Sequence, residues 1–201
     1  MFSICFCGVD GSGKTSQINI LKDILKRINR EVIVIHMFSE NSTIISKLHN
    51  KNIINKFIVF IRNLNDSFLN SSLKIIMRLT NILLDSWITT AINARKYKNK
   101  IVIYDRYFYD VLVILASEYP KIVNFLMSFA VIIPKPNTVF ILDINPEVAI
   151  QRKEENSLRE TKVVCDLYRL LGEKINWEPV NANLSKTEVS AQIQKSLKGI
   201  I

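Results

Sequence analysis

The distribution of apolar residues divides the chain into short continuous runs and longer stretches with a helical repeat. The continuous runs cover residues 2–9, 31–37, 101–104 and 138–144, and residues 177–180 form a shorter run of the same kind. A nearly unbroken apolar run is typical of a strand buried on both faces of a parallel sheet, whereas a half-exposed strand alternates. The pattern therefore predicts five strands, the last of them short.

Between these runs, apolar residues recur three and four positions apart, which predicts amphipathic helices. The predicted helices cover residues 18–28, 73–97, 110–118, 121–132, 161–175 and 185–197, and a further helix opens at Pro146. Glu188 follows Ser185 by three residues, so the last helix is expected to begin with a capping box. Residues 39–70 hold an apolar segment at 53–64 between two polar stretches, and they predict no clear element.

The order of these elements defines the fold class. Strands alternate with helices and no hairpin signal separates them, which predicts an α/β fold with a parallel five-stranded sheet and helices on both faces, in three layers. We expect a single domain over residues 1–201. In such a sheet the ligand binds along the C-terminal ends of the strands.

Composition and charge narrow the classes of partner. A length of 201 residues with 48% hydrophobic residues supports one large core. The net charge of +9 permits an acidic partner, yet Lys and Arg are scattered, so we expect polyphosphate ligands and no dedicated nucleic-acid site. The long apolar regions, residues 53–92 and 122–134, lack 18 consecutive charge-free apolar positions, and we expect no membrane span.

The three cysteines indicate a reducing, cytoplasmic setting. Cys5 and Cys7 lie two apart in the first predicted strand and therefore point to the same face. Together with the distant Cys165 they are interpreted as small buried hydrophobic residues and not as a disulfide framework.

The most specific chemical signal is the sequence G-V-D-G-S-G-K-T at residues 8–15, which fits the phosphate-binding P-loop. Three of the five glycines in the chain fall within it. Glycine lets the backbone bring its N–H groups up to phosphate oxygens, and the following helix N-terminus adds a positive dipole end. We expect Lys14 to reach the β- and γ-phosphates and Thr15 to hold Mg²⁺. The predicted ATP-binding residues are Gly8, Val9, Asp10, Gly11, Ser12, Gly13, Lys14, Thr15 and Ser16.

Two further segments carry candidate chemistry. The strand at 101–104 runs into Asp105-Arg106-Tyr107, and a carboxylate at that end of a strand lies beside the P-loop, so Asp105 is predicted to share the metal with Thr15. Residues 151–160 are charged and almost devoid of apolar side chains. They form either a solvated loop or, at about residues 152–160, a lid whose arginines close over the phosphates. His36 is expected to be structural.

Four separated segments resemble the thymidylate kinase family of P-loop nucleoside monophosphate kinases. They are residues 8–17, 101–107 and 136–152 and the downstream helix that carries Tyr168. The resemblance implies a P-loop kinase fold with a short lid, ATP and Mg²⁺ as cofactors, and phosphoryl transfer from ATP to dTMP. It also implies a homodimer.

The resemblance further implies roles for single residues. Lys14, Asp10, Arg152 and Arg159 are the implied catalytic residues, with the two arginines supplied by the lid because Gly11 stands where part of the family has an arginine. Asp10 is implied to contact the sugar of the acceptor and Arg106 its phosphate, where a planar bidentate donor suits the anion. Tyr107 and Trp87 complete the implied acceptor site, and Phe68 is an alternative to Trp87 for stacking on the base.

The chain also departs from the family pattern on the acceptor side. The Arg-Glu-Pro signature is replaced by residues 36–40, H-M-F-S-E, and the aromatic-Asp-Arg segment is present only as residues 84–87, L-D-S-W, without its arginine. Tyr107 is followed by Phe108-Tyr109-Asp110 in place of a serine-containing continuation. Three hypotheses therefore remain: a dTMP kinase, a kinase of another small acceptor, and a nucleotide-binding protein without transfer activity.

Overall fold

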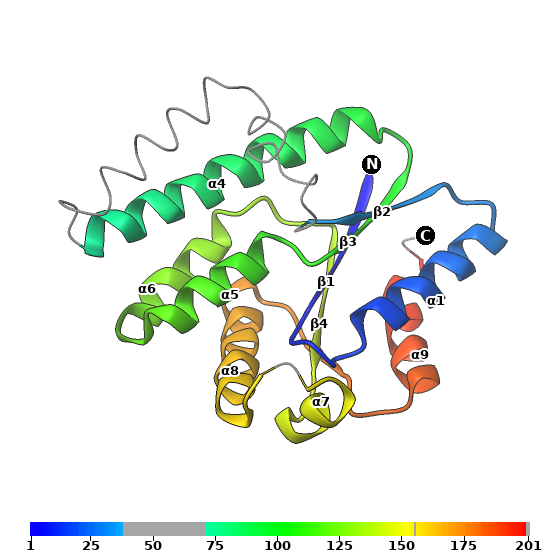
Figure 1. Ribbon diagram of the computed structural model, residues 1–201. Helices are drawn as coiled ribbons and strands as arrows, with labels where there is room; N and C mark the ends of the chain where they lie inside the picture. Colours follow the sequence, from blue (N-terminus) through cyan, green and yellow to red (C-terminus); the bar gives the residue numbers. More distant parts are fainter. Residues whose placement is uncertain (38–70, 155, 200–201) are drawn as a thin grey trace.

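The fold was examined in a computed structural model that describes residues 1–37, 71–154 and 156–199 (Figure 1). These residues contain a five-stranded, all-parallel sheet with strand order β2-β3-β1-β4-β5. The strands are β1 (Phe2–Cys7), β2 (Val32–His36), β3 (Ile101–Asp105), β4 (Thr138–Asp143) and β5 (Val180–Asn181). The central strand β1 ends in the P-loop, so the sheet places that loop between the ends of β3 and β4.

Helices cover both faces of the sheet, as the sequence predicts. In Figure 1, α1 and α9 lie side by side on one face, and α5, α6 and α8 lie on the other. The described helices are α1 (Lys14–Arg27), α4 (Ser71–Lys96), α5 (Phe108–Glu118), α6 (Val123–Ser128), α7 (Pro146–Arg152), α8 (Leu158–Ile175) and α9 (Lys186–Leu197), with 3₁₀ turns η1 (Pro120–Ile122) and η2 (Phe129–Val131). The predicted three-layer α/β architecture is confirmed.

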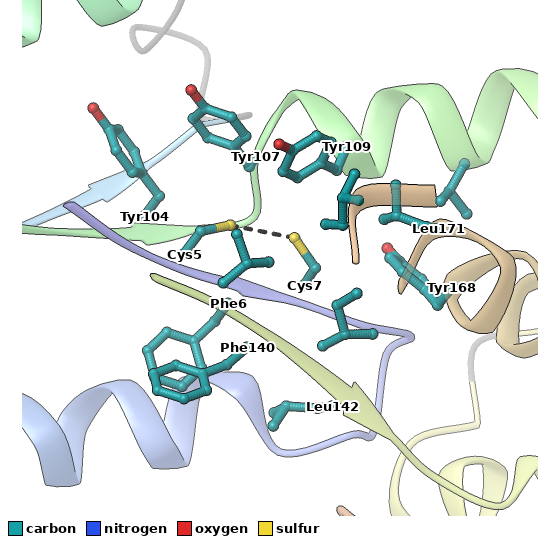
Figure 2. Packing of buried hydrophobic residues seen from close by; sticks show 14 of the residues in the cluster. Cys5, Phe6, Cys7, Tyr104, Tyr107, Tyr109, Phe140, Leu142, Tyr168 and Leu171 are labelled. Carbon is teal, nitrogen blue, oxygen red and sulfur yellow. Dashed lines mark hydrogen bonds between the residues drawn. The ribbon is translucent and has the colours of Figure 1, made fainter. Parts of the chain in front are cut away.

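The core packs differently on the two faces of β1 (Figure 2). Cys5 and Cys7 point together toward a group of buried tyrosines, and their sulfur atoms lie 3.2 Å apart. On the other face Phe6 packs on Phe140 with ring centroids 5.2 Å apart. All three cysteines are free and buried, which confirms their interpretation as hydrophobic core residues.

Several predicted boundaries change. Helix α8 begins at Leu158 and not at residue 161, because Ser157 caps it: Glu160 N–H donates to Ser157 Oγ (3.3 Å), and Ser157 N–H donates to the Glu160 carboxylate (3.0 Å). Residues 158–160 of the predicted lid are therefore helical. The helix predicted at 121–132 is broken into η1, α6 and η2, and β5 covers only Val180–Asn181 and not residues 177–180. The apolar segment at 53–64 and Phe68 lie outside the described residues.

One described helical stretch, Lys74–Lys96 in α4, is long and apolar enough to cross a membrane by length and composition, with a mean hydropathy of 1.2. The sequence criterion of 18 charge-free positions missed it because the stretch contains Arg78 and Asp85. Both charged residues are engaged within the fold, since Arg78 pairs with Glu118 of α5 and the buried Asp85 accepts a hydrogen bond from Thr89 (3.3 Å). The Arg78–Glu118 pair and the burial of Asp85 favour a helix packed on the domain over a membrane span.

Candidate functional site

The P-loop connects β1 to α1 with a backbone that only glycine accommodates well. Gly11 has φ +80°, and a Cβ built on it would lie 2.3 Å from the carbonyl oxygen of Ala149 in α7. Gly13 has φ +92° with open space around it, and α1 starts at the next residue with no side-chain cap. The first N–H groups of α1 therefore face the space above the loop and are available to an anion.

Lys14 folds back over this loop. Its ammonium donates hydrogen bonds to the carbonyl oxygens of Gly8 (2.7 Å) and Val9 (2.8 Å) and lies 3.8 Å from the Asp10 carboxylate. The side chain is buried, and burial, together with the neighbouring Arg106 cation, lowers the pKa of Lys14. Because burial makes this ammonium costly, it is well placed to gain from an incoming phosphate.

Asp105 ends β3 next to the P-loop. It is in register with Phe6 of β1 and with His36 of β2, and its carboxylate lies 2.8 Å from Nδ1 of His36. Thr15 is exposed at the first turn of α1. The sheet thus brings the two predicted metal ligands to the same side of the loop.

Arg106 is held in an unusual conformation. Its φ is +67°, in the left-handed region, and its backbone N–H donates to the Phe6 carbonyl (3.0 Å). This conformation costs a residue with a Cβ roughly 1–2 kcal/mol. It aims the guanidinium at the P-loop, where Nη2 donates to Asp10.

Asp110 is a component of the site that sequence reasoning did not assign. It is fully buried and accepts hydrogen bonds from the Tyr107 N–H (2.8 Å) and the Tyr168 hydroxyl (2.6 Å), and Nη1 of Arg106 lies 3.9 Å away. Burial raises the pKa of Asp110. The available signal was the sequence itself, because an acidic residue in the first turn of an otherwise apolar helix is typically a capping residue.

Two adjoining hollows open around these residues. The larger has a volume of about 730 Å³ and the smaller about 360 Å³, and Asp10, Arg106 and Lys153 line both. The larger hollow is also lined by residues 11–17, Asp105, Arg152, Ala182, Leu184, Ser185, Lys186 and Val189. The smaller is also lined by Val9, Ile114, Ser117, Ile150, Asn156, Glu160, Thr161, Val164 and Tyr168.

Not every predicted site residue reaches these hollows. Arg152 lines the larger one and donates from Nη1 to the Ala182 carbonyl (3.1 Å), whereas Arg159 is exposed on the first turn of α8 and lines neither. Tyr107 is buried, with its hydroxyl donating to Pro134 (2.7 Å), and Trp87 donates from Nε1 to Ile132 (3.2 Å). Neither aromatic side chain lines the two hollows.

The sequence profile of the thymidylate kinase family matches residues 6–193. The chain belongs to this family. The match covers the end of β1, the P-loop, the Asp105-Arg106-Tyr107 turn and all described helices from α1 to α8, so it includes both hollows. The resemblance seen in the sequence is confirmed.

A curated relative of the thymidylate kinase family supports the same assignment. The chain is 30% identical over 207 residues to "Probable thymidylate kinase 1" of Saccharolobus solfataricus, a match that covers 94% of this chain and 95% of that protein. The two proteins therefore correspond along essentially their whole length.

The family implies ATP as the phosphate donor, and the residues present fit it. The P-loop backbone is shaped by glycines, Lys14 is buried beside it, and Ser12 Oγ is buried without a hydrogen-bond partner in the part of the chain that the structure describes. Such an orphaned hydroxyl and free helix N–H groups need an acceptor, which a phosphate supplies.

Proposed function

We propose that the protein transfers the γ-phosphoryl group of ATP to dTMP and produces dTDP. The observation that carries this proposal is the position of Asp10 and Arg106, which contact each other where the P-loop hollow and the smaller hollow meet. A donor in one hollow and an acceptor in the other would bring their phosphates together at this pair. Phosphoryl transfer depends mainly on such positioning and on charge stabilisation.

The larger hollow is the proposed donor site. Residues 10–16, which line this hollow, would surround the triphosphate, while Gly8 and Val9 of the predicted set lie outside it. The Lys14 ammonium would exchange its two carbonyl partners for phosphate oxygens. Thr15 and Asp105 would hold Mg²⁺, which usually binds through one or two protein oxygens together with substrate phosphates and water. The metal would screen the negative charge of the phosphates.

The smaller hollow is the proposed acceptor site. Arg106 can present a planar edge of N–H donors to the acceptor phosphate, and Asp10 lies where it can contact the acceptor sugar. Tyr107 would contribute indirectly, because its backbone is part of the turn that orients Arg106. We retain Trp87 as a candidate for contact with the base, since 58% of its surface is exposed.

We propose different catalytic contributions for the two arginines of the charged stretch. Arg152 lines the donor hollow and is the candidate to neutralise the transferring phosphoryl group. Arg159 lies next to Glu160, which lines the acceptor hollow, and would have to turn inward to contribute. We therefore expect the lid function to rest mainly on Arg152.

A second candidate acceptor is another nucleoside monophosphate. The observation in its favour is Asp85, which is buried and bonded to Thr89, in a segment where the family pattern has an arginine after the aspartate and this chain has Ser86. The same segment has Leu84 where the family pattern has the aromatic residue that stacks on the base, which relaxes the demand for thymine.

The proposal is tested by measuring ADP release from Mg-ATP with a panel of nucleoside monophosphates. Lys14→Ala is the inactive blank, and Lys26→Ala, at an exposed lysine of the same helix, is the matched control. Stimulation by dTMP alone supports the dTMP kinase, and stimulation by another nucleotide supports the second candidate. ATP binding without any acceptor-stimulated turnover contradicts both and favours a non-catalytic nucleotide-binding protein.

Two further properties belong to this proposal. We place the protein in the cytoplasm, where its substrates are made. We also propose a homodimer, supported by further exposed apolar side chains on α4, namely Ile76, Leu84, Ile88 and Ile92. Sedimentation velocity at several protein concentrations tests the assembly, and a single monomeric species at all of them contradicts it.

A further inference from the structure

Asp110 connects three elements that are separate in the sequence. The carboxylate belongs to the first turn of α5 and binds the hydroxyl of Tyr168, 58 residues away in α8. It also binds the backbone N–H at Tyr107, the residue directly after Arg106. None of its surface is exposed, so solvent contributes nothing to its hydrogen bonding.

A wholly buried carboxylate destabilises the fold unless its oxygens are fully partnered. The hydrogen bonds from Tyr107 and Tyr168 satisfy one acceptor position on each oxygen. Nη1 of Arg106, at 3.9 Å from Oδ1, lies at ion-pair distance but beyond hydrogen-bond distance. A neutral side chain could cap α5 without the cost of burying a charge. The negative charge of Asp110 is therefore better explained by its attraction to the Arg106 guanidinium.

Arg106 lies between two carboxylates of different character. Asp10, on the P-loop side, is about one-third exposed and belongs to the proposed substrate site. Asp110, on the core side, is fixed by its two hydrogen bonds. When a phosphate binds Arg106, the partly exposed Asp10 carboxylate can turn aside, whereas the Asp110 carboxylate stays held by its two hydrogen bonds.

We propose that Asp110 is a positioning residue that anchors Arg106 from the core side and keeps its guanidinium aimed at the acceptor hollow. The anchoring concerns the protein alone, and its consequence for acceptor binding rests on the function proposed above. In this arrangement, Tyr168 has a supporting role, because it holds the carboxylate in place from α8.

The direct test is the mobility of the Arg106 guanidinium, measured by ¹⁵N NMR on the ligand-free protein, with Arg106→Lys to assign the signals. The wild-type protein should show resolved Nη signals with slow rotation. Because Asp10 also holds Nη2, the variants are compared in an Asp10→Asn background: there Asp110→Asn should merge the signals, while Asp166→Asn, which alters an exposed carboxylate bound to Arg169, should leave them unchanged. Averaged signals in the wild type, or an Asn variant as ordered as the wild type, would overturn the proposal.

The second readout is the kinetic split between substrates. Loss of positioning should raise the acceptor KM of Asp110→Asn by about tenfold or more and leave the ATP KM within about twofold. A purely structural role would lower the melting temperature and change neither KM. Should the Asn variant not fold, Asp110→Ser is smaller and also neutral, and Tyr168→Phe, which keeps the charge but removes one of the two hydrogen bonds that fix it, should loosen Arg106 less than Asp110→Ser does.

The two proposals can fail independently. If no nucleoside monophosphate supports turnover by the wild type, the proposed function is wrong, and the NMR comparison still decides whether Asp110 anchors Arg106. If turnover is normal and Arg106 is equally ordered without Asp110, only the anchoring is wrong.

Discussion

Asp10 of the P-loop and Arg106 of the turn after β3 contact each other across 96 positions of sequence. The contact depends on the sheet order, because β1 and β3 are neighbours and Phe6 is in register with Asp105. It joins the two halves of the proposed site without any ligand. Arg106 is therefore the residue at which acceptor binding can be separated from ATP binding by mutation.

Replacing Arg106 with lysine should weaken the binding of the acceptor more than the binding of ATP. Lysine keeps the charge and loses the planar pair of donors, which costs about 1.5–3 kcal/mol for a hydrogen bond to a charged group. The acceptor KM should rise roughly tenfold to a hundredfold, with the ATP KM little changed, in steady-state assays. Arg27→Lys, at an exposed position in α1, is the control, and an equal rise in both KM values would contradict the role given to Arg106.

Gly11→Ala and Gly13→Ala should destabilise the protein by different amounts. Both glycines have positive φ, so both substitutions strain the backbone, by roughly 1 kcal/mol or more. Only at Gly11 does the new Cβ also meet backbone, the Ala149 carbonyl at 2.3 Å. Urea unfolding should therefore show the larger loss for Gly11→Ala, and equal losses would mean that α7 shifts freely away from the loop.

The cap of α8 should make part of the stability depend on pH. The hydrogen bonds from Ser157 to Glu160 lower the pKa of Glu160 below its usual 4.5. A carboxylate with a lowered pKa stabilises the folded state above its unfolded pKa, and this contribution is lost as the pH falls through the folded value. Glu160→Gln should thus be less stable than the wild type at pH 7, with the difference shrinking below about pH 4.5.

Thermal unfolding of both proteins at several pH values measures this dependence. Glu173→Gln, an exposed substitution later in the same helix, serves as the reference. A Glu160 difference that does not change between pH 7 and pH 3 would show that the cap does not act through the charge of the carboxylate.

The cysteines should react slowly in the native protein. Burial raises the pKa of the Cys5 and Cys7 thiols, and it raises the pKa of Cys165 to about 11. Few thiolates therefore exist at pH 8, and reagents have no access to them. A thiol assay with Ellman's reagent should detect three groups rapidly only after denaturation, and fast native labelling would contradict the packing around β1.

The sequence predicted those features that depend on neighbouring residues. The P-loop, the hydrophobic runs that form the strands and the Ser185–Glu188 cap are each encoded within a few positions, and the structure confirms them. The start of α8 was placed three residues late, because the charged residues before Thr161 hid the equally local Ser157–Glu160 cap.

The acceptor side was harder to predict because its contacts are distant in sequence. The bond between Asp110 and Tyr168 spans two helices, and the positive φ of Arg106 has no signature in a non-glycine residue. Tyr107 and Trp87 were assigned by family resemblance alone. Their hydroxyl and indole N–H bind the backbone at Pro134 and Ile132, and their roles toward an acceptor stay predictions.

The two carbonyl contacts of Lys14 have a consequence for the energetics of nucleotide capture. By donating to the Gly8 and Val9 oxygens, the ammonium fixes the backbone at the start of the loop. Capture then exchanges one set of partners for another and leaves little conformational entropy to be lost at that moment. In this sense Lys14 preorganises the backbone of the P-loop before the nucleotide binds.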